Sequence, residues 1–157
     1  MRSYFRFRES PRAAARWVAD MKKRFPGFAY RNVKGATAEW NGFLQPREGR
    51  TTYQIKVRVP QAGRVQVLVT RPALDPRARH RYRDGSLCLY DPDDRTWTRD
   101  MPLSKLVALA AVWLYFYEKW LTTGQWFVDE APHGTAADKA DPHEFGDEEL
   151  VSLPSSH

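Results

Sequence analysis

The chain has 157 residues, of which 42% are apolar and 13% aromatic, which is enough for one domain with a buried core. Its single cysteine excludes an intramolecular disulfide and a zinc site built from several thiolates. The net charge of +6 divides into a basic part, residues 1–128, with 24 bases and 11 acids, and an acidic part, residues 129–157, with one base and eight acids.

The sequence predicts a cytoplasmic protein. The longest charge-free apolar run, residues 106–117, is shorter than the ~20 residues that a membrane span needs. Residues 1–8 carry arginines where a secretory signal has its apolar segment. A lone cysteine also suits a reducing compartment.

The first predicted element is a helix that starts at Ser10-Pro11 and ends before Pro26-Gly27. Serine is favoured at the N-cap and proline at the first helical position. Apolar residues at helical spacing mark one face, and most of the bases fall on the other. We expect this amphipathic helix to pack on a sheet, with docking of a partner to its basic face as the alternative.

Residues 36–72 are predicted to form three strands, at 36–44, 53–59 and 65–70. In the second and third, apolar and polar residues alternate, which is typical of a half-buried strand. Short turns join the three, so neighbouring strands should run antiparallel as a meander.

Residues 73–103 show no long periodic pattern, and long irregular segments in small domains are usually functional. Residues 87–89 could form a short fourth strand. A second helix is predicted from Ser104, as its cap, to about Leu121, with Thr122-Thr123-Gly124 as the stop. It is apolar nearly all round, so it should be largely buried or lie in a homodimer interface. The fold class is α+β, with helices on one side of the sheet.

Cys88 lies in the middle of the irregular segment. It could be inert core, an intermolecular disulfide partner, or a nucleophile. Gly85 allows a sharp turn before it, and a positive setting favours the reactive thiolate. A nucleophilic sulfur must stand at the surface with a groove leading to it, so a sulfur sealed beneath packed side chains would remove the basis for this role. The basic residues near it are Arg77, Arg79, His80, Arg81 and Arg83.

The order of elements resembles that of ubiquitin-conjugating enzymes, in which a histidine precedes the active cysteine in a long loop after the meander. The resemblance is closer to the bacterial branch of the family, the conjugating enzymes of short type II CBASS antiphage systems, and covers residues 10–128. The residues that carry it are His80, Tyr82, Gly85, Leu87, Cys88, Leu89, Tyr90, Pro92 and Trp97, then Trp113, Tyr117, Glu118, Trp120 and Leu121, and the run Thr123-Gly124-Gln125-Trp126.

The resemblance implies that Cys88 carries the C-terminus of a protein, a cGAS-like nucleotidyltransferase, as a thioester and passes it to an amine on a target protein. It implies that His80 acts as acid or base, or fixes the loop. Tyr82 and Asp84 could orient the incoming lysine or stabilise the oxyanion, although Asp84 beside Gly85 could also be turn chemistry alone.

Two departures from the family pattern stand out. The proline and asparagine that usually follow the histidine are replaced by Arg81-Tyr82. The two usual C-terminal helices have no counterpart, because residues 129–157 read as an acidic, largely disordered tail.

Other functions have weaker support in the sequence. A non-catalytic binding module of the same fold stays open, as does a cysteine hydrolase. Nucleic-acid binding by the basic part lacks a basic motif interleaved with aromatics. No cofactor is predicted, because no phosphate-binding glycine motif occurs. A metal site is not predicted either, because ligand-pair spacing is absent among Cys88, His80, His133 and His143.

Overall fold

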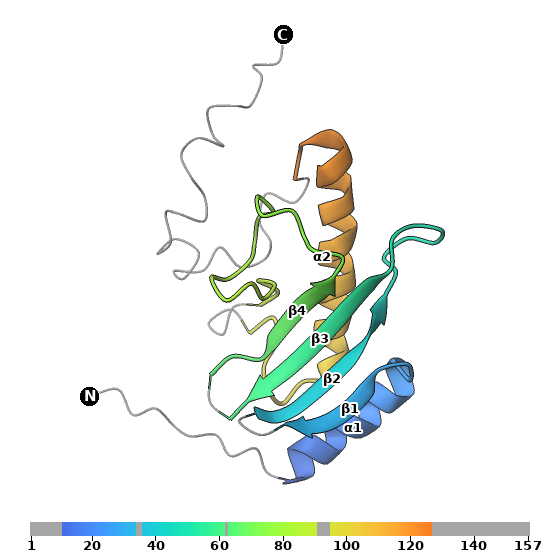
Figure 1. Cartoon of the computed structure of the whole chain (residues 1–157). Coiled ribbons are helices and arrows are strands. Elements are labelled where there is room, and N and C mark those ends of the chain that lie inside the picture. The colour runs from blue at the N-terminus through green and yellow to red at the C-terminus, as the bar shows by residue number, and fades with distance from the viewer. Residues whose placement is uncertain (1–10, 34–35, 62, 91–94, 127–157) are drawn as a thin grey trace, which may run out of the picture.

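The structure, a computed structural model, describes residues 11–33, 36–61, 63–90 and 95–126 (Figure 1). Four strands form one antiparallel sheet in the order β1-β2-β3-β4, so the predicted meander and the α+β class are confirmed. The elements in chain order are α1 (Pro11–Arg24), β1 (Ala29–Val33), β2 (Ala36–Leu44), β3 (Tyr53–Pro60), β4 (Gln66–Arg71) and α2 (Leu103–Thr123).

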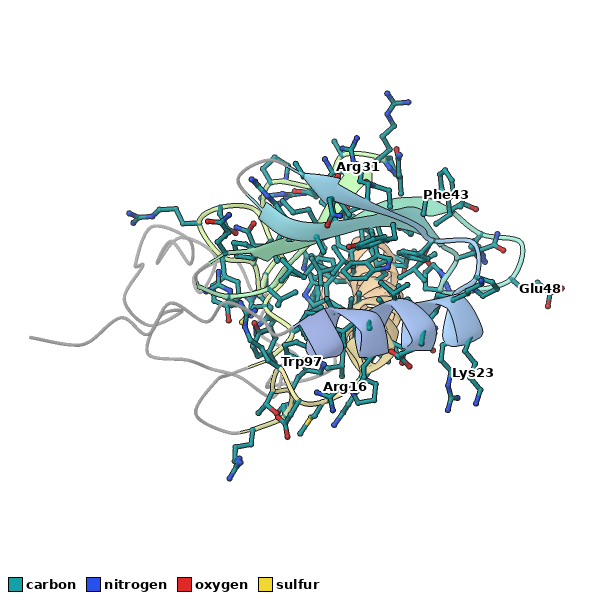
Figure 2. The ribbon with its side chains drawn as sticks, turned by 90° about the horizontal axis from the view of Figure 1, so that it is seen from below. Arg16, Lys23, Arg31, Phe43, Glu48 and Trp97 are labelled. Atoms are coloured by element: carbon teal, nitrogen blue, oxygen red, sulfur yellow. The ribbon has the colours of Figure 1, made fainter. Side chains whose placement is uncertain are left out.

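Both helices pack against the same face of the sheet (Figure 2). The alternation predicted for β3 is confirmed, since Tyr53, Ile55, Val57 and Val59 are buried while the residues between them are partly or well exposed. Apolar side chains of both helices complete the core against these residues. The face of β2 and β3 that the helices leave uncovered carries mostly polar side chains, with the exposed Phe43 as an exception, as expected for an antiparallel sheet covered on one side.

The fourth strand is β1, not residues 87–89. Leu87 forms only an isolated bridge with Arg81. Strand β1 was not predicted because it is an edge strand in which four of five residues are exposed, so it lacks the apolar alternation of a half-buried strand.

The start of α2 also differs from the prediction. The helix begins at Leu103, and Ser104 lies inside it instead of capping it. The backbone N–H and the hydroxyl of Ser104 each donate to the carboxylate of Asp20 at 2.8 Å. The carboxylate of Asp20 in α1 therefore caps the N-terminus of α2 and joins the two helices. Of the predicted stop, Gly124 is confirmed, because it adopts φ 70° and its N–H donates to the carbonyl of Trp120, whereas Thr122 and Thr123 still belong to the helix.

Helix α2 is buried along one side and exposed along the other. Trp113 and Tyr117 lie in the core, whereas Val112 and Leu121 are about half exposed. The helix is therefore not buried all round, and the homodimer interface stays a prediction. Of the helices in the described ranges, none has the length and apolar character that crossing a membrane requires. Ser10 and the predicted tail, residues 129–157, lie outside the described residues.

Candidate active site

Cys88 belongs to a tight hairpin formed by residues 80–88, which we call the cysteine hairpin. The N–H of Tyr82 donates to the carbonyl of Ser86, and the N–H of Cys88 donates to the carbonyl of His80, each at 2.8 Å. Between these two bonds Arg81 pairs with Leu87. The register therefore places His80 opposite Cys88 and Tyr82 opposite Ser86.

The turn of this hairpin depends on Gly85. Its N–H donates to the carbonyl of Tyr82 at 2.9 Å, and its φ of 84° lies in the left-handed region. A turn of this kind followed by a left-handed residue is a common way to close a three-residue hairpin loop, and glycine adopts that conformation without a steric penalty. The hairpin joins the sheet through the N–H of Leu87, which donates to the carbonyl of Val67 at 2.8 Å.

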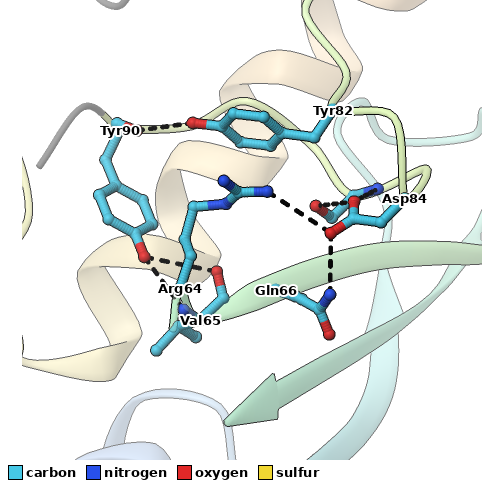
Figure 3. Close-up of polar contacts among 7 residues, drawn as sticks. Arg64, Val65, Gln66, Tyr82, Asp84 and Tyr90 are labelled. Atoms are coloured by element: carbon cyan, nitrogen blue, oxygen red, sulfur yellow. Dashed lines mark hydrogen bonds and ion pairs between the residues drawn. The ribbon is translucent and has the colours of Figure 1, made fainter. Parts of the chain in front are cut away.

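Asp84 fastens the tip of the hairpin to the sheet (Figure 3). One carboxylate oxygen accepts from the N–H of Ser86 at 2.8 Å and from its hydroxyl, and the other accepts from Gln66 at 2.8 Å and from Arg64 at 3.4 Å. Burial acts to raise the pKa of Asp84, but the hydrogen bonds from Ser86 and Gln66 and the charge of Arg64 outweigh it and lower the pKa. In this conformation the carboxylate of Asp84 therefore has the structural role in the turn, which was one of its two predicted roles.

Tyr82 is also engaged in this conformation. Its hydroxyl donates to the carbonyl of Tyr90 at 3.1 Å, and the guanidinium carbon of Arg64 lies 3.2 Å from the centre of its ring. The hydroxyl of Tyr90 in turn accepts from the N–H of Val65 at 3.1 Å, and burial raises the pKa of this hydroxyl to about 12. The phenol that was predicted to assist an oxyanion is thus committed to a backbone carbonyl.

The prediction of a surface sulfur is wrong for this conformation, because Cys88 is only 1% exposed. Its neighbours Leu87 and Leu89 belong to the hydrophobic core cluster, and Cys88 and Tyr82 are buried as well. Side chains alternate along an extended strand, so the sulfur lies on the face of the hairpin opposite to Leu87. We call this the outer face of the hairpin. The groups that bury the sulfur therefore lie against the outer face.

His80, the first residue of the hairpin, contacts a tryptophan that follows α2. Its φ of 57° is left-handed, and its ring centre is 5.4 Å from that of Trp126. Trp126 also contacts Trp113 and Trp120, at 5.4 and 6.5 Å between ring centres. The turn at Gly124 thus brings the last described residue back beside His80.

Two of the arginines near Cys88 shape the segment that leads into the hairpin. Arg77 forms an ion pair with Asp75 at 3.0 Å, and the hydrogen bonds from Arg77, followed by its charge, lower the pKa of Asp75 although burial acts to raise it. Arg81 donates to the carbonyls of Asp75 and Pro76. The N–H of Asp75 donates to the hydroxyl of Tyr117, so this segment is also joined to α2.

The sequence did not predict the parts played by Arg64, Gln66 and Trp126. Gln66 lies at an outward position of an alternating strand, which indicated exposure and nothing more. Arg64 was one base among many in the basic part. Trp97, predicted to pack beside the cysteine loop, is fully buried, with its ring centre 5.2 Å from that of Tyr90. In the described ranges no three His, Cys, Asp or Glu side chains are grouped so that they could hold a metal ion.

An antiparallel four-stranded meander between an N-terminal and a C-terminal helix, with a cysteine hairpin after the last strand, is compatible with the class of ubiquitin-conjugating-enzyme-like folds. A family model described as "Type II CBASS E2 protein" matches residues 18–134, well over half of the chain. The chain belongs to this family, which assigns it to CBASS antiphage defence. A comparison with curated proteins finds no match.

Proposed function

We propose that this protein is a conjugating enzyme that carries the C-terminus of another protein as a thioester on Cys88. The donor would be a cGAS-like nucleotidyltransferase of the same defence system, and the acceptor an amine of a target protein, in the reducing cytoplasm. The observation that carries the proposal is the family match over residues 18–134, which includes the one cysteine of the chain in its hairpin.

The chemistry uses two properties of sulfur. The Cys88 thiolate attacks the activated carbonyl carbon of the donor's C-terminus, and the activating group leaves, so that a thioester forms. The target amine then attacks the same carbon, the C–S bond breaks, and the thiolate is regenerated while the amine loses a proton to a base. His80, placed opposite Cys88 by the register, is the residue that we propose for this proton transfer.

The proposal requires a second conformation, because a sulfur that is 1% exposed cannot meet a protein C-terminus. Local opening of single hairpins is common at functional sites, since such elements unfold with lower free energies than the core around them. Tyr82 and Asp84 could contact substrate only after leaving the partners described above. In the described conformation we therefore give them a structural role.

Burial of Cys88 favours a second candidate function. A non-catalytic module of the same fold would dock the nucleotidyltransferase and leave the cysteine idle in the interior. Buried free cysteines generally behave as small apolar side chains, so this alternative has a specific structural basis.

Intact-mass measurement of the protein co-expressed with the nucleotidyltransferase of its own system separates the two functions. We expect an adduct that a thiol reagent cleaves, a thiol-resistant oxyester in Cys88→Ser, and no adduct in Cys88→Ala. Phage protection should be lost in Cys88→Ala. If Cys88→Ala is folded, binds the nucleotidyltransferase and protects as well as the unchanged protein, the docking function replaces conjugation.

A further inference from the structure

Tyr82 lies on the same face of the cysteine hairpin as Cys88. Tyr82 lies opposite Ser86, two residues before Cys88, and its hydroxyl reaches the carbonyl of Tyr90, two residues after Cys88. The register puts Tyr82, Ser86 and Cys88 on one face of the hairpin. The ring of Tyr82 therefore runs along the face that bears the sulfur, past the position of Cys88.

This ring is held in place by a residue from outside the hairpin. Arg64, in the connection between β3 and β4, places its guanidinium carbon 3.2 Å from the centre of the Tyr82 ring, well within the range of a cation–π contact (Figure 3). The same guanidinium pairs with Asp84 at 3.4 Å. One side chain thus fixes both the ring of Tyr82 and the tip of the hairpin, while Gln66 adds a third contact from β4.

Arg64 itself is accessible, since 28% of its side chain is exposed. The guanidinium of Arg64 contacts Tyr82 and Asp84, both in the hairpin, so a change at Arg64 should act on the hairpin before it acts on the core. By contrast, release of Leu87 would remove an apolar side chain from the core and break its hydrogen bond to Val67. The outer contacts are therefore the part of the hairpin that can open at lower cost.

We propose that Arg64 is a positioning residue that holds Tyr82 over Cys88, and that release of this latch is the step that gives access to the sulfur. The proposed function requires access to Cys88. The latch itself can be measured without a donor or target protein, so it can be tested separately from that function. It assigns to Tyr82 the role of a cover and to Arg64 a role in the reaction through Tyr82.

The latch can be tested by the rate at which iodoacetamide modifies Cys88 in the folded, full-length protein, followed by intact mass. We expect Arg64→Met to react about tenfold faster or more, because the ring loses its cation. Arg64→Lys retains a cation and should react at a rate closer to that of the unchanged protein. Tyr82→Ala removes the cover and should react fast, whereas Tyr82→Phe keeps the ring and should lie between.

Arg50→Met is the matched control, because Arg50 is an exposed arginine in the β2–β3 turn, far along the chain from the hairpin. Urea unfolding of each variant gives the globally unfolded fraction. The proposal is overturned if Arg64→Met and Tyr82→Ala react at the unchanged rate, if Arg50→Met accelerates equally, or if each acceleration is no larger than the rise in the unfolded fraction. Faster alkylation together with no thioester in any variant would retain the latch and refute the conjugating function.

Discussion

Asp84 uses both oxygens of its carboxylate to hold the hairpin closed. Ser86 occupies one of them, and Gln66 and Arg64 occupy the other. A carboxylate with these partners is stabilised in its charged form, which agrees with its lowered pKa. Its charge is therefore part of the structure of the hairpin, and a role toward an incoming lysine would require these contacts to break first.

Replacement of Asp84 by asparagine should destabilise the protein in a pH-dependent way. Asparagine keeps one oxygen for Ser86 but presents an amide donor toward Gln66 and Arg64, so we expect a loss of about 1 kcal/mol in the free energy of unfolding at neutral pH. Because the native pKa of Asp84 is lowered, its stabilisation is complete above the ordinary value of 3.8 and is lost as the pH falls through the native pKa.

Urea unfolding at neutral pH and in steps below pH 3.8 measures this difference. Glu48→Gln is the control. Glu48 is exposed in the β2–β3 turn, and its substitution by glutamine also removes one negative charge. The two proteins, unchanged and Asp84→Asn, should converge in stability in acid. A difference that stays constant across the pH range would contradict the role given to the charged carboxylate.

At the scale of elements, the sequence predicts structure well where local pattern and burial agree. Strand β3 alternates because one of its faces is in the core, and α1 begins at the expected proline. Prediction fails where a distant residue intervenes or burial is slight. Ser104 looked like a cap, but Asp20 supplies the capping carboxylate from 84 residues away. Strand β1 was missed because its residues are mostly exposed.

Gly42 in β2 offers a test of how closely the first connection packs on the sheet. A Cβ at Gly42 would lie 2.4–2.6 Å from ring atoms of Phe28, the residue just before β1. We expect Gly42→Ala to lower the free energy of unfolding by about 1–3 kcal/mol, because the ring or the strand must move. Gly27→Ala is the matched control, since nothing lies within 4 Å of its added Cβ.

Both variants add one methyl group within the same small region, so urea unfolding compares them directly. Gly27→Ala should stay within about 0.5 kcal/mol of the unchanged protein. Equal effects of the two substitutions would mean that the close approach of Phe28 to β2 contributes nothing specific.

At the scale of the whole molecule, the sequence predicted which segment bears the cysteine but not the state of the sulfur. The turn at Gly85 and the basic residues around Cys88 were visible in the sequence. The contacts that close the hairpin join Asp84 to Arg64 and Gln66, 20 and 18 residues earlier, and the ring beside His80 belongs to Trp126. Such long-range contacts decide whether the sulfur of Cys88 is buried, and a local sequence pattern does not predict them.

The uneven charge along the chain leads to a last prediction, which concerns the nucleic-acid alternative. Residues 1–128 carry 24 bases and 11 acids, and residues 129–157 carry one base and eight acids. If the basic part attracts nucleic acid only through charge, the acids after residue 128 oppose that attraction. Replacing Asp147, Glu148 and Glu149 by the corresponding amides removes three negative charges and raises the net charge of +6 by three. We expect tighter binding of duplex DNA, on the order of two- to tenfold at low salt.

Fluorescence anisotropy of a labelled duplex across a salt series measures this effect, and alanine at Ser152, Ser155 and Ser156 gives a control with three substitutions and no change in charge. The amide variant and the unchanged protein should converge as salt rises, because the screening length falls from about 8 Å at physiological ionic strength to about 3 Å at 1 M. An affinity that persists at high salt and differs between DNA sequences would have to come from base recognition. That result would restore nucleic-acid binding as a function of this chain, because general attraction between charges produces neither property.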